Sequence, residues 1–182
     1  VSAIVCVVMA VVVFLVYHLK VSLIRTYKDK HDYVNAREIK WVNWVFVFLG
    51  ISVACVINLY GKDEIGGPGI AFFVRFFFSI SGATLIIYIA SLILKYYYPT
   101  PLHKKLRKFR YAPRTSSAGN KMKLLSEDEE DVHLNEGMQA EENIFSIDYD
   151  VWIDEKTQEV RIEKYQGHLI SLQCNNCGFY TM

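Results

Sequence analysis

Three long apolar stretches in the first hundred residues constrain this chain more than any other feature of its sequence. They cover residues 1–19, 41–60 and 69–97, and the residues within them that are expected to be charged are Arg75 and Lys95. A hydrocarbon core of about 30 Å requires about 20 helical residues, and each stretch meets that length. Because the stretches leave almost no polar face to contact water, they predict three transmembrane helices and not the core helices of a soluble protein.

A signal peptide is the alternative interpretation of the first stretch. It would need a positively charged segment before the apolar run and a cleavage site of small residues after it, and residues 1–19 have neither. Since the chain begins with Val1, we interpret it as starting inside a longer protein.

Basic side chains are concentrated in two segments outside the apolar stretches. Residues 1–60 hold 6 basic and 3 acidic side chains, all within 20–40, and residues 95–126 hold 9 basic and no acidic side chains. Positively charged segments remain on the cytoplasmic side of a membrane. We therefore predict an integral protein of the inner or plasma membrane. Its N-terminus is outside, the basic loop 20–40 is cytoplasmic, the connection 61–68 is extracytoplasmic, and the tail from residue 98 is cytoplasmic.

Small residues in the second and third stretches allow helices to approach each other closely. Gly50 and Ala54 form one small-xxx-small pair, and Ser79 and Ala83 form another. Such contacts matter in lipid because no hydrophobic driving force acts between helices there. Three short helices bury little surface, so we expect further subunits or helices outside this chain. Aromatic residues typical of membrane interfaces flank the second and third stretches: Trp41, Trp44, Tyr60, Tyr96, Tyr97 and Tyr98.

The segment 98–125 is predicted to be a basic juxtamembrane region followed by a polar linker. Leu102, Leu106 and Phe109 are spaced to share one face of a helix, which favours a short amphipathic helix on the inner leaflet. Each basic residue near an anionic membrane surface contributes roughly 1 kcal/mol of attraction. A nucleic-acid site is the alternative, but the adjacent transmembrane helix favours anionic lipid head groups. The predicted lipid-surface residues are Lys104, Lys105, Arg107, Lys108 and Arg110.

Residues 126–143 are predicted to form an acidic helix. Ser126 and Glu129 have the spacing of a capping box, and the acids that follow Ser126 are favoured in the first turn of a helix. The segment lacks the alternating acids and the glycine of an EF-hand loop, so we interpret it as a solvated face and not as a cation site. Residues 127–182 carry 14 acidic and 3 basic side chains, which makes the tail acidic.

Residues 144–182 are predicted to fold as a three-stranded antiparallel meander with one apolar face. Apolar and polar residues alternate over 145–154, which is typical of a half-buried strand. The return strand is predicted to place Val160 opposite Val151, because burial of one face sets the register.

The predicted third strand covers residues 170–174. It follows a three-residue loop at 166–168, because that loop length places Leu172 on the apolar face of the meander. Gly167 is expected to adopt a positive φ in this loop, which glycine does without a steric penalty.

The predicted meander ends in the pattern C-x-x-C-G, formed by Cys174, Cys177 and Gly178. This pattern resembles the knuckle of a zinc ribbon, where glycine permits a tight turn and backbone donors reach the thiolate sulfurs. A zinc ribbon needs four ligands, and Cys6 and Cys55 lie in the apolar stretches, so the pair would be half of a zinc site. The remaining ligands are expected beyond this segment or on another subunit.

Three other roles remain open for the cysteine pair. A redox C-x-x-C is typical of a thioredoxin-like βαβ unit, which a β-meander does not offer. A structural disulfide is disfavoured in a cytoplasmic tail, because that compartment keeps thiols reduced. The third alternative is a pair that binds no metal and forms no bond. Of these roles, the zinc half-site is favoured.

The sequence contains no nucleophile elbow, phosphate loop, zincin motif or convincing pair of carboxylates, so it does not identify an enzyme. We predict a non-catalytic polytopic membrane protein that is an accessory, assembly or scaffolding subunit of a membrane complex. Its zinc-ribbon-like cytoplasmic tail would bind a protein partner, and other membrane subunits would contact its helices. The alternative is the membrane portion of an enzyme or transporter whose active, extracytoplasmic domain precedes Val1.

Overall fold

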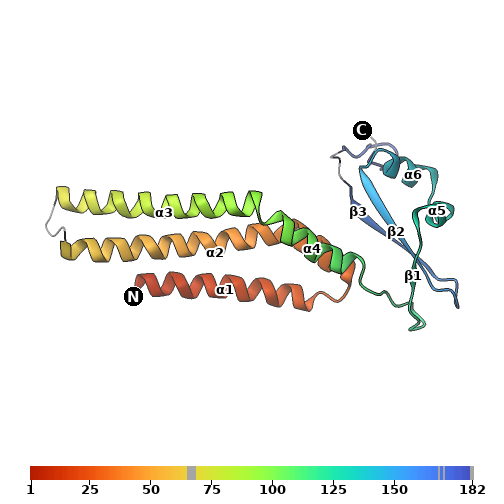
Figure 1. The fold of residues 1–182 in the computed structure, drawn as a ribbon, viewed down its shortest axis with the longest axis horizontal. Coiled ribbons are helices and arrows are strands. Elements are labelled where there is room, and N and C mark those ends of the chain that lie inside the picture. The colour runs from red at the N-terminus through yellow and green to blue at the C-terminus, as the bar shows by residue number, and fades with distance from the viewer. Residues whose placement is uncertain (65–68, 168, 170, 181–182) are drawn as a thin grey trace. The chain divides into compact units, whose positions relative to one another are not determined.

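The computed structural model describes residues 1–64, 69–167, 169 and 171–180 (Figure 1). The chain divides into two compact units, Val1–Tyr111 and Ala112–Met182. The predicted combination of three long apolar helices and a small antiparallel sheet is confirmed. Of the predicted connection 61–68, residues 65–68 lie outside the described residues.

The described residues of the first unit form the helices α1 (Ser2–Leu23), α2 (Tyr27–Glu64), α3 (Ile70–Tyr96) and α4 (Pro99–Arg110). In the described part of the chain, α1, α2 and α3 are long and apolar enough to cross a membrane. Figure 1 shows α1 and α3 on opposite sides of α2. The helix α2 is therefore the central element of this unit.

The helices of the first unit place small side chains between them and large apolar side chains outside. Gly50 of α2 and Ala83 of α3 are buried. A Cβ added to Gly50 would lie 2.6 Å from Ile87 Cγ1, so the observed approach of α2 and α3 requires glycine there. Phe73 and Phe77 of α3, in contrast, are 68% and 66% exposed. The expectation that small residues mediate helix packing is confirmed, and the exposed phenylalanines suit a lipid-facing surface.

The prediction of a loop over residues 20–40 is wrong. The helix α1 continues to Leu23, and α2 already begins at Tyr27. The Thr26 hydroxyl caps the start of α2 by accepting a hydrogen bond from the Asp29 backbone N–H at 3.0 Å. The charged turns that follow stay helical because one of their faces packs against α4.

The amphipathic helix predicted within 98–125 is confirmed as α4, and proline occupies its first turn. Its apolar residues Leu102 and Leu106 are each 5% exposed and pack against Val34, which is fully buried. The apolar face of α4 thus contacts α2. This corrects the predicted orientation, in which that face lay on the inner leaflet.

The second unit contains a sheet with the strand order β1–β2–β3, in which both pairs of strands are antiparallel. Its strands are β1 (Lys123–Leu124), β2 (Ile147–Ile153) and β3 (Val160–Gln166). The short helices α5 (Glu127–Glu130), η1 (Asp131–His133) and α6 (Glu136–Asn143) connect β1 to β2.

The predicted pairing of β2 with a return strand is confirmed, but its register is wrong. Val151 pairs with Ile162, and Ile153 pairs with Val160, so the register differs from the prediction by two residues. The cause is a longer turn organised by Asp154. Its carboxylate accepts hydrogen bonds from the Lys156 N–H at 3.0 Å and from the Thr157 hydroxyl at 2.7 Å. Such side-chain bonds to the local chain favour turns over an extended ladder.

The third strand of the sheet is β1, and not the predicted strand over 170–174. Lys123 and Leu124 pair with Ile153 and Trp152, so β2 is the central strand. Of the predicted segment, residue 170 lies outside the described residues, and Gln173 forms an isolated bridge with Tyr180 instead of pairing with β3. Which segment forms the third strand depends on which distant part of the chain reaches the edge of β2. The alternation of residues within one strand does not contain that information.

The sheet is buried on both faces along β2, which corrects the prediction of one apolar face. Ile147, Tyr149 and Val151 pack with Leu134 and Met138 on one side. On the other side, Trp152 is 4% exposed although the strand alternates in sequence.

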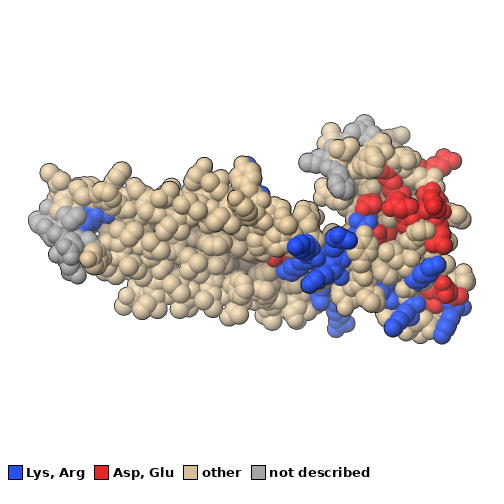
Figure 2. All heavy atoms as spheres, in the orientation of Figure 1, with Lys and Arg blue, Asp and Glu red and all other residues tan. Residues whose placement is uncertain are grey.

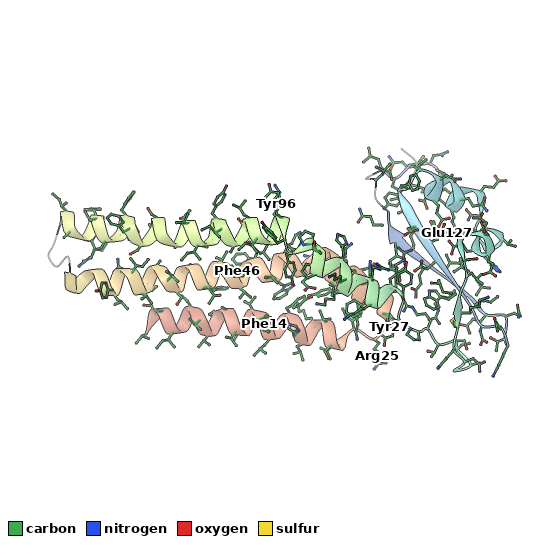
Figure 3. All side chains as sticks on the ribbon, in the orientation of Figure 1. Phe14, Arg25, Tyr27, Phe46, Tyr96 and Glu127 are labelled. Atoms are coloured by element: carbon green, nitrogen blue, oxygen red, sulfur yellow. The ribbon has the colours of Figure 1, made fainter. Side chains whose placement is uncertain are left out.

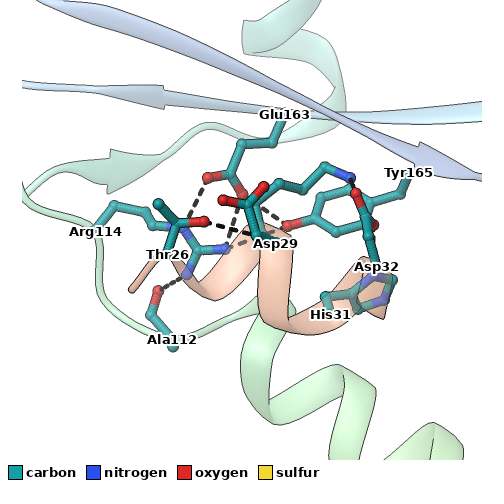
Figure 4. Close-up of polar contacts among 9 residues, drawn as sticks. Thr26, Asp29, His31, Asp32, Ala112, Arg114, Glu163 and Tyr165 are labelled. Atoms are coloured by element: carbon teal, nitrogen blue, oxygen red, sulfur yellow. Dashed lines mark hydrogen bonds and ion pairs between the residues drawn. The ribbon is translucent and has the colours of Figure 1, made fainter. Parts of the chain in front are cut away.

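A polar cluster packs against the Trp152 side of β2. The Arg114 guanidinium lies 4.9 Å from the Trp152 ring and forms two bonds to the Glu163 carboxylate, at 2.8 and 3.0 Å (Figure 4). The Tyr165 hydroxyl also donates to Glu163, at 2.7 Å. This bidentate pair satisfies both charges, which allows them to be buried beside an aromatic ring.

The acidic helix predicted over 126–143 is interrupted. The Ser126–Glu129 capping box is present at α5, but the chain then passes through η1 before α6 begins. The Asn135 side chain caps α6 by accepting the Met138 N–H at 2.9 Å. An asparagine favours such a cap over a helix interior, because its side chain competes for backbone groups.

Gly167 does not adopt the positive φ predicted for it. It is needed for a different reason, because an added Cβ would lie 2.4 Å from the Phe145 carbonyl oxygen. The Gly167 N–H donates to the Ser146 carbonyl at 2.9 Å, so the backbone passes too closely for a side chain. The rest of the predicted 166–168 loop includes residue 168, which lies outside the described residues.

Candidate functional site

The basic side chains of α4 form the first candidate site. Lys104, Arg107 and Lys108 are exposed, and Figure 2 shows Lys and Arg side chains gathered over this helix. Their spacing of three and four residues places them on one face of α4, away from buried Leu102 and Leu106. Of the predicted lipid-surface residues, Arg110 is only partly exposed.

Lys105 does not belong to this face, which corrects the predicted set. Its ammonium group lies 2.8 Å from the Glu38 carboxylate of α2, and Glu38 is 5% exposed. The hydroxyls of Tyr17 and Tyr98 also donate to Glu38, at 2.8 and 2.6 Å. Each oxygen of the buried carboxylate therefore has a donor, and the cluster ties α4 to α1 and α2.

Glu38 was not identified from the sequence, although one signal was present. Val34, Glu38 and Trp41 are spaced by four and three residues, so they share one face of a helix. An acid on a face that otherwise carries apolar and aromatic residues indicates burial with a partner. The prediction of a loop over residues 20–40 leaves no helical face on which this burial could be recognised.

Lysine side chains at the same end of the bundle rest on aromatic rings. Lys20 lies 5.2 Å from the centre of the Trp41 ring, and Lys95 lies 5.4 Å from that of Tyr96. Tyr96 is 65% exposed and projects outward from the end of α3 (Figure 3). Aromatic rings beside cationic side chains are typical of a membrane–water interface.

The C-x-x-C-G segment forms the second candidate site. The Cys174 N–H donates to the Phe179 carbonyl and the Gly178 N–H donates to the Cys174 carbonyl, both at 2.8 Å. Gly178 has φ of 79°, as a tight turn between two paired residues requires. The nearby backbone N–H groups of Cys177 and Asn176 favour a charged sulfur at Cys174, which lowers the pKa of that thiol below its usual value. The turn therefore favours the thiolate form of Cys174, which is the form that binds metals.

Glu141 of α6 joins this turn to the rest of the unit. It is fully buried and accepts hydrogen bonds from the Tyr149 hydroxyl and the Tyr180 backbone N–H, and Lys164 lies 3.1 Å away. Burial alone would raise the pKa of Glu141, but these donors outweigh it and hold the pKa below its usual value. The sequence interpretation had placed this residue on a solvated acidic face, and that is wrong.

Glu130 is a second buried acid of this unit, and it has a different environment. It is 4% exposed and accepts one hydrogen bond, from the Val151 N–H at 3.3 Å. Burial, together with the negative charges of Glu142 and Glu127, raises its pKa to about 7. A carboxyl with this pKa is partly protonated at neutral pH.

Within the described residues, no group of three or more His, Cys, Asp or Glu side chains could hold a metal ion. Comparisons of the chain with family models, with curated proteins and with solved structures found no match.

Proposed function

We propose that this chain is a non-catalytic membrane subunit that holds a small partner-binding unit, Ala112–Met182, on the cytoplasmic side of a membrane. In this proposal Cys174 and Cys177 form half of a zinc site at the edge of that unit. The observation that carries it is the turn around Cys174, where backbone N–H groups stabilise the thiolate and Gly178 has a left-handed conformation. Such a turn presents two sulfur ligands on one short segment.

The chemistry of zinc explains why this half-site implies a partner. Structural zinc is bound by four ligands in a tetrahedron, so Cys174 and Cys177 leave two positions to be filled. These ligands come from residues outside the described part of the chain or from another subunit. In either case the segment that supplies them is held against this unit, and the metal then contributes to assembly.

The arrangement of the first unit supports the proposed topology. The contacts of Glu38 with Tyr98 and Lys105 place the basic segments 20–40 and 98–110 at one end of the helices. We call this the basic end of the bundle. By the positive-inside rule it is cytoplasmic, and the tail that follows α4 starts on the same side.

Metal analysis of the purified, reduced full-length protein tests the proposal. We expect one zinc per chain if the chain itself completes the site, or one zinc per two chains if two copies share it. The double variant Cys174→Ser, Cys177→Ser is expected to lose the metal. The matched control is Cys6→Ser, Cys55→Ser, which removes the two thiols of α1 and α2 and is expected to retain it.

The same preparations test the partner. A protein that co-purifies in fixed stoichiometry, is lost from the Cys174/Cys177 variant and remains with the control would support docking through this turn. Absence of zinc from reduced wild-type protein, or equal zinc in both variants, would overturn the metal part of the proposal.

A further inference from the structure

We infer that α4 is a preformed binding surface for anionic lipid head groups, built from Lys104, Arg107 and Lys108, and that Lys105 instead fastens this helix to the bundle through Glu38. The inference does not depend on zinc. It requires only that α1, α2 and α3 span the membrane. The occupant is the membrane's own anionic lipid, because the surface begins at the end of a spanning helix.

The position of α4 supports a membrane occupant. The helix α3 ends at Tyr96 and α4 starts at Pro99, so two residues separate them. At 1.5 Å per residue, Lys108 lies about 14 Å along α4 from Pro99. The three cations are therefore close to the level at which phosphate groups of the adjacent leaflet lie.

The packing of α4 determines which side chains are available. Leu102 and Leu106 are buried against Val34, so the helix cannot insert its apolar face into the membrane. Lys104, Arg107 and Lys108 are exposed on the other side. Within the described residues of Val1–Tyr111, none of these three side chains makes an ion pair or a hydrogen bond, whereas the Lys105 side chain is paired with Glu38.

The chemistry of the three side chains fits phosphodiester head groups. An arginine guanidinium binds phosphate oxygens in a bidentate manner, and the two lysines add compact charges within one turn of it. Because α4 is already folded and packed, binding orders less of the chain than binding by a disordered basic segment would. Each of the three charges is expected to increase the affinity for an anionic head group roughly fivefold at low salt.

Lipid selectivity of the full-length protein tests this inference. The protein is assembled in nanodiscs of phosphatidylcholine mixed with phosphatidylglycerol. After the protein is extracted from the nanodiscs, native mass spectrometry counts the bound molecules of each lipid. We expect wild type to be enriched in phosphatidylglycerol over the bulk mixture. The variant K104Q/R107Q/K108Q is expected to lose most of that enrichment, and added salt is expected to reduce the enrichment of wild type.

A matched control removes the same number of positive charges, three, from the second unit. The variant K121Q/K123Q/K156Q changes three exposed lysines of Ala112–Met182 and is expected to retain phosphatidylglycerol like wild type. Circular dichroism and gel filtration confirm that each variant is folded. Equal enrichment in wild type and in K104Q/R107Q/K108Q would overturn the inference. So would unchanged lipid binding together with loss of affinity for a single-stranded RNA probe, which would assign the surface to nucleic acid.

Lys105 provides the second test, because its proposed role is to position α4. Lys105→Gln is expected to lower the melting temperature while the phosphatidylglycerol enrichment stays within about twofold of wild type. Lys104→Gln is expected to do the opposite, since its side chain has no partner among the described residues of Val1–Tyr111. If both single variants lose lipid equally, Lys105 belongs to the surface and the proposed division of roles is wrong.

Discussion

Glu38 in the helical unit and Glu141 in the C-terminal unit are both buried carboxylates, and each is bound by tyrosine and lysine side chains. Their surroundings differ. Large apolar side chains cover the outside of the helices, whereas the second unit buries an apolar cluster of Leu134, Ile147, Tyr149 and Val151. The two units thus differ in which residues they bury, but in both of them several elements converge on one carboxylate.

The two carboxylates also differ in what they hold. The donors to Glu38 come from α1, from α4 and from the residue before α4, so this residue fastens helices to each other. The donors to Glu141 include the backbone N–H of Tyr180, so it fastens an irregular segment to the sheet. A backbone donor cannot turn toward water when its acceptor is lost. We therefore expect the second unit to depend more strongly on its carboxylate.

The largest effect is expected for Glu141→Ala. Removing the carboxylate leaves the Tyr149 hydroxyl and the Tyr180 N–H without an acceptor and Lys164 without its counter-ion, which is expected to cost about 3–5 kcal/mol. Hydrogen exchange of the β2 amides in the full-length protein measures this loss as reduced protection. The control is Glu155→Ala at an exposed turn position. Equal protection in the two variants would show that Glu141 is not a structural centre.

The second prediction compares Glu141 with Glu130, which has no cationic partner within the described residues of its unit. The pKa of Glu130 is raised from 4.5 to about 7, so the folded protein keeps a proton that the unfolded chain releases. Stability contributed by this group is therefore present below about pH 4.5 and is lost as the pH rises to about 7, by up to about 3 kcal/mol.

Thermal unfolding of the full-length protein across this pH range checks whether this part of the stability falls as the pH rises. Glu130→Gln is expected to remove this part of the pH dependence, because the amide stays neutral. A wild-type stability that rises with pH over the same interval, by an amount that Glu130→Gln abolishes, would contradict the assignment.

A smaller loss, about 1.5–3 kcal/mol, is expected for Glu38→Gln, because a neutral amide keeps part of the hydrogen bonding but loses the charge pair with Lys105. Lys105 is 33% exposed and can reach water when the pair is broken. A double-mutant cycle with Lys105→Gln in the purified protein isolates the pair. Additive changes in melting temperature would show that the two residues do not act together.

The smallest effect, about 1–3 kcal/mol, is expected for Gly50→Val, which forces α2 away from Ile87 of α3. Val56→Leu on the same helix is the control, since Val56 is 53% exposed. Thermal stability in one detergent compares the two. A larger effect of Val56→Leu would contradict the assignment of small residues to the inside of the bundle.

Features that depend on a single segment were predictable. The length and apolar character of α1 and α3, the amphipathic spacing of α4, the Ser126–Glu129 capping box and the alternation in β2 each lie within one short stretch of sequence. Each is a periodicity or a local hydrogen bond, so it is visible without knowledge of the fold.

Features that depend on two distant segments were not predictable. Lys105 and Glu38 are 67 residues apart, and Tyr180 and Glu141 are 39 residues apart. The same holds for β1, which is separated from β2 by α5, η1 and α6 in the sequence and yet pairs with it. The many charged residues of 20–40 led to the prediction of a loop there, and those of 126–143 led to the prediction of a solvated helix face.

The sequence by itself determined the apolar spans, the concentration of positive charge beside them and the capping box at Ser126 and Glu129. Only the tertiary structure decided which charges face outward and which are buried, because the choice depends on a partner from another element. Lys104 and Lys105 are neighbours in sequence, yet one is exposed and the other binds Glu38. A helix turns by about 100° per residue, and what packs against each direction is set by the rest of the chain.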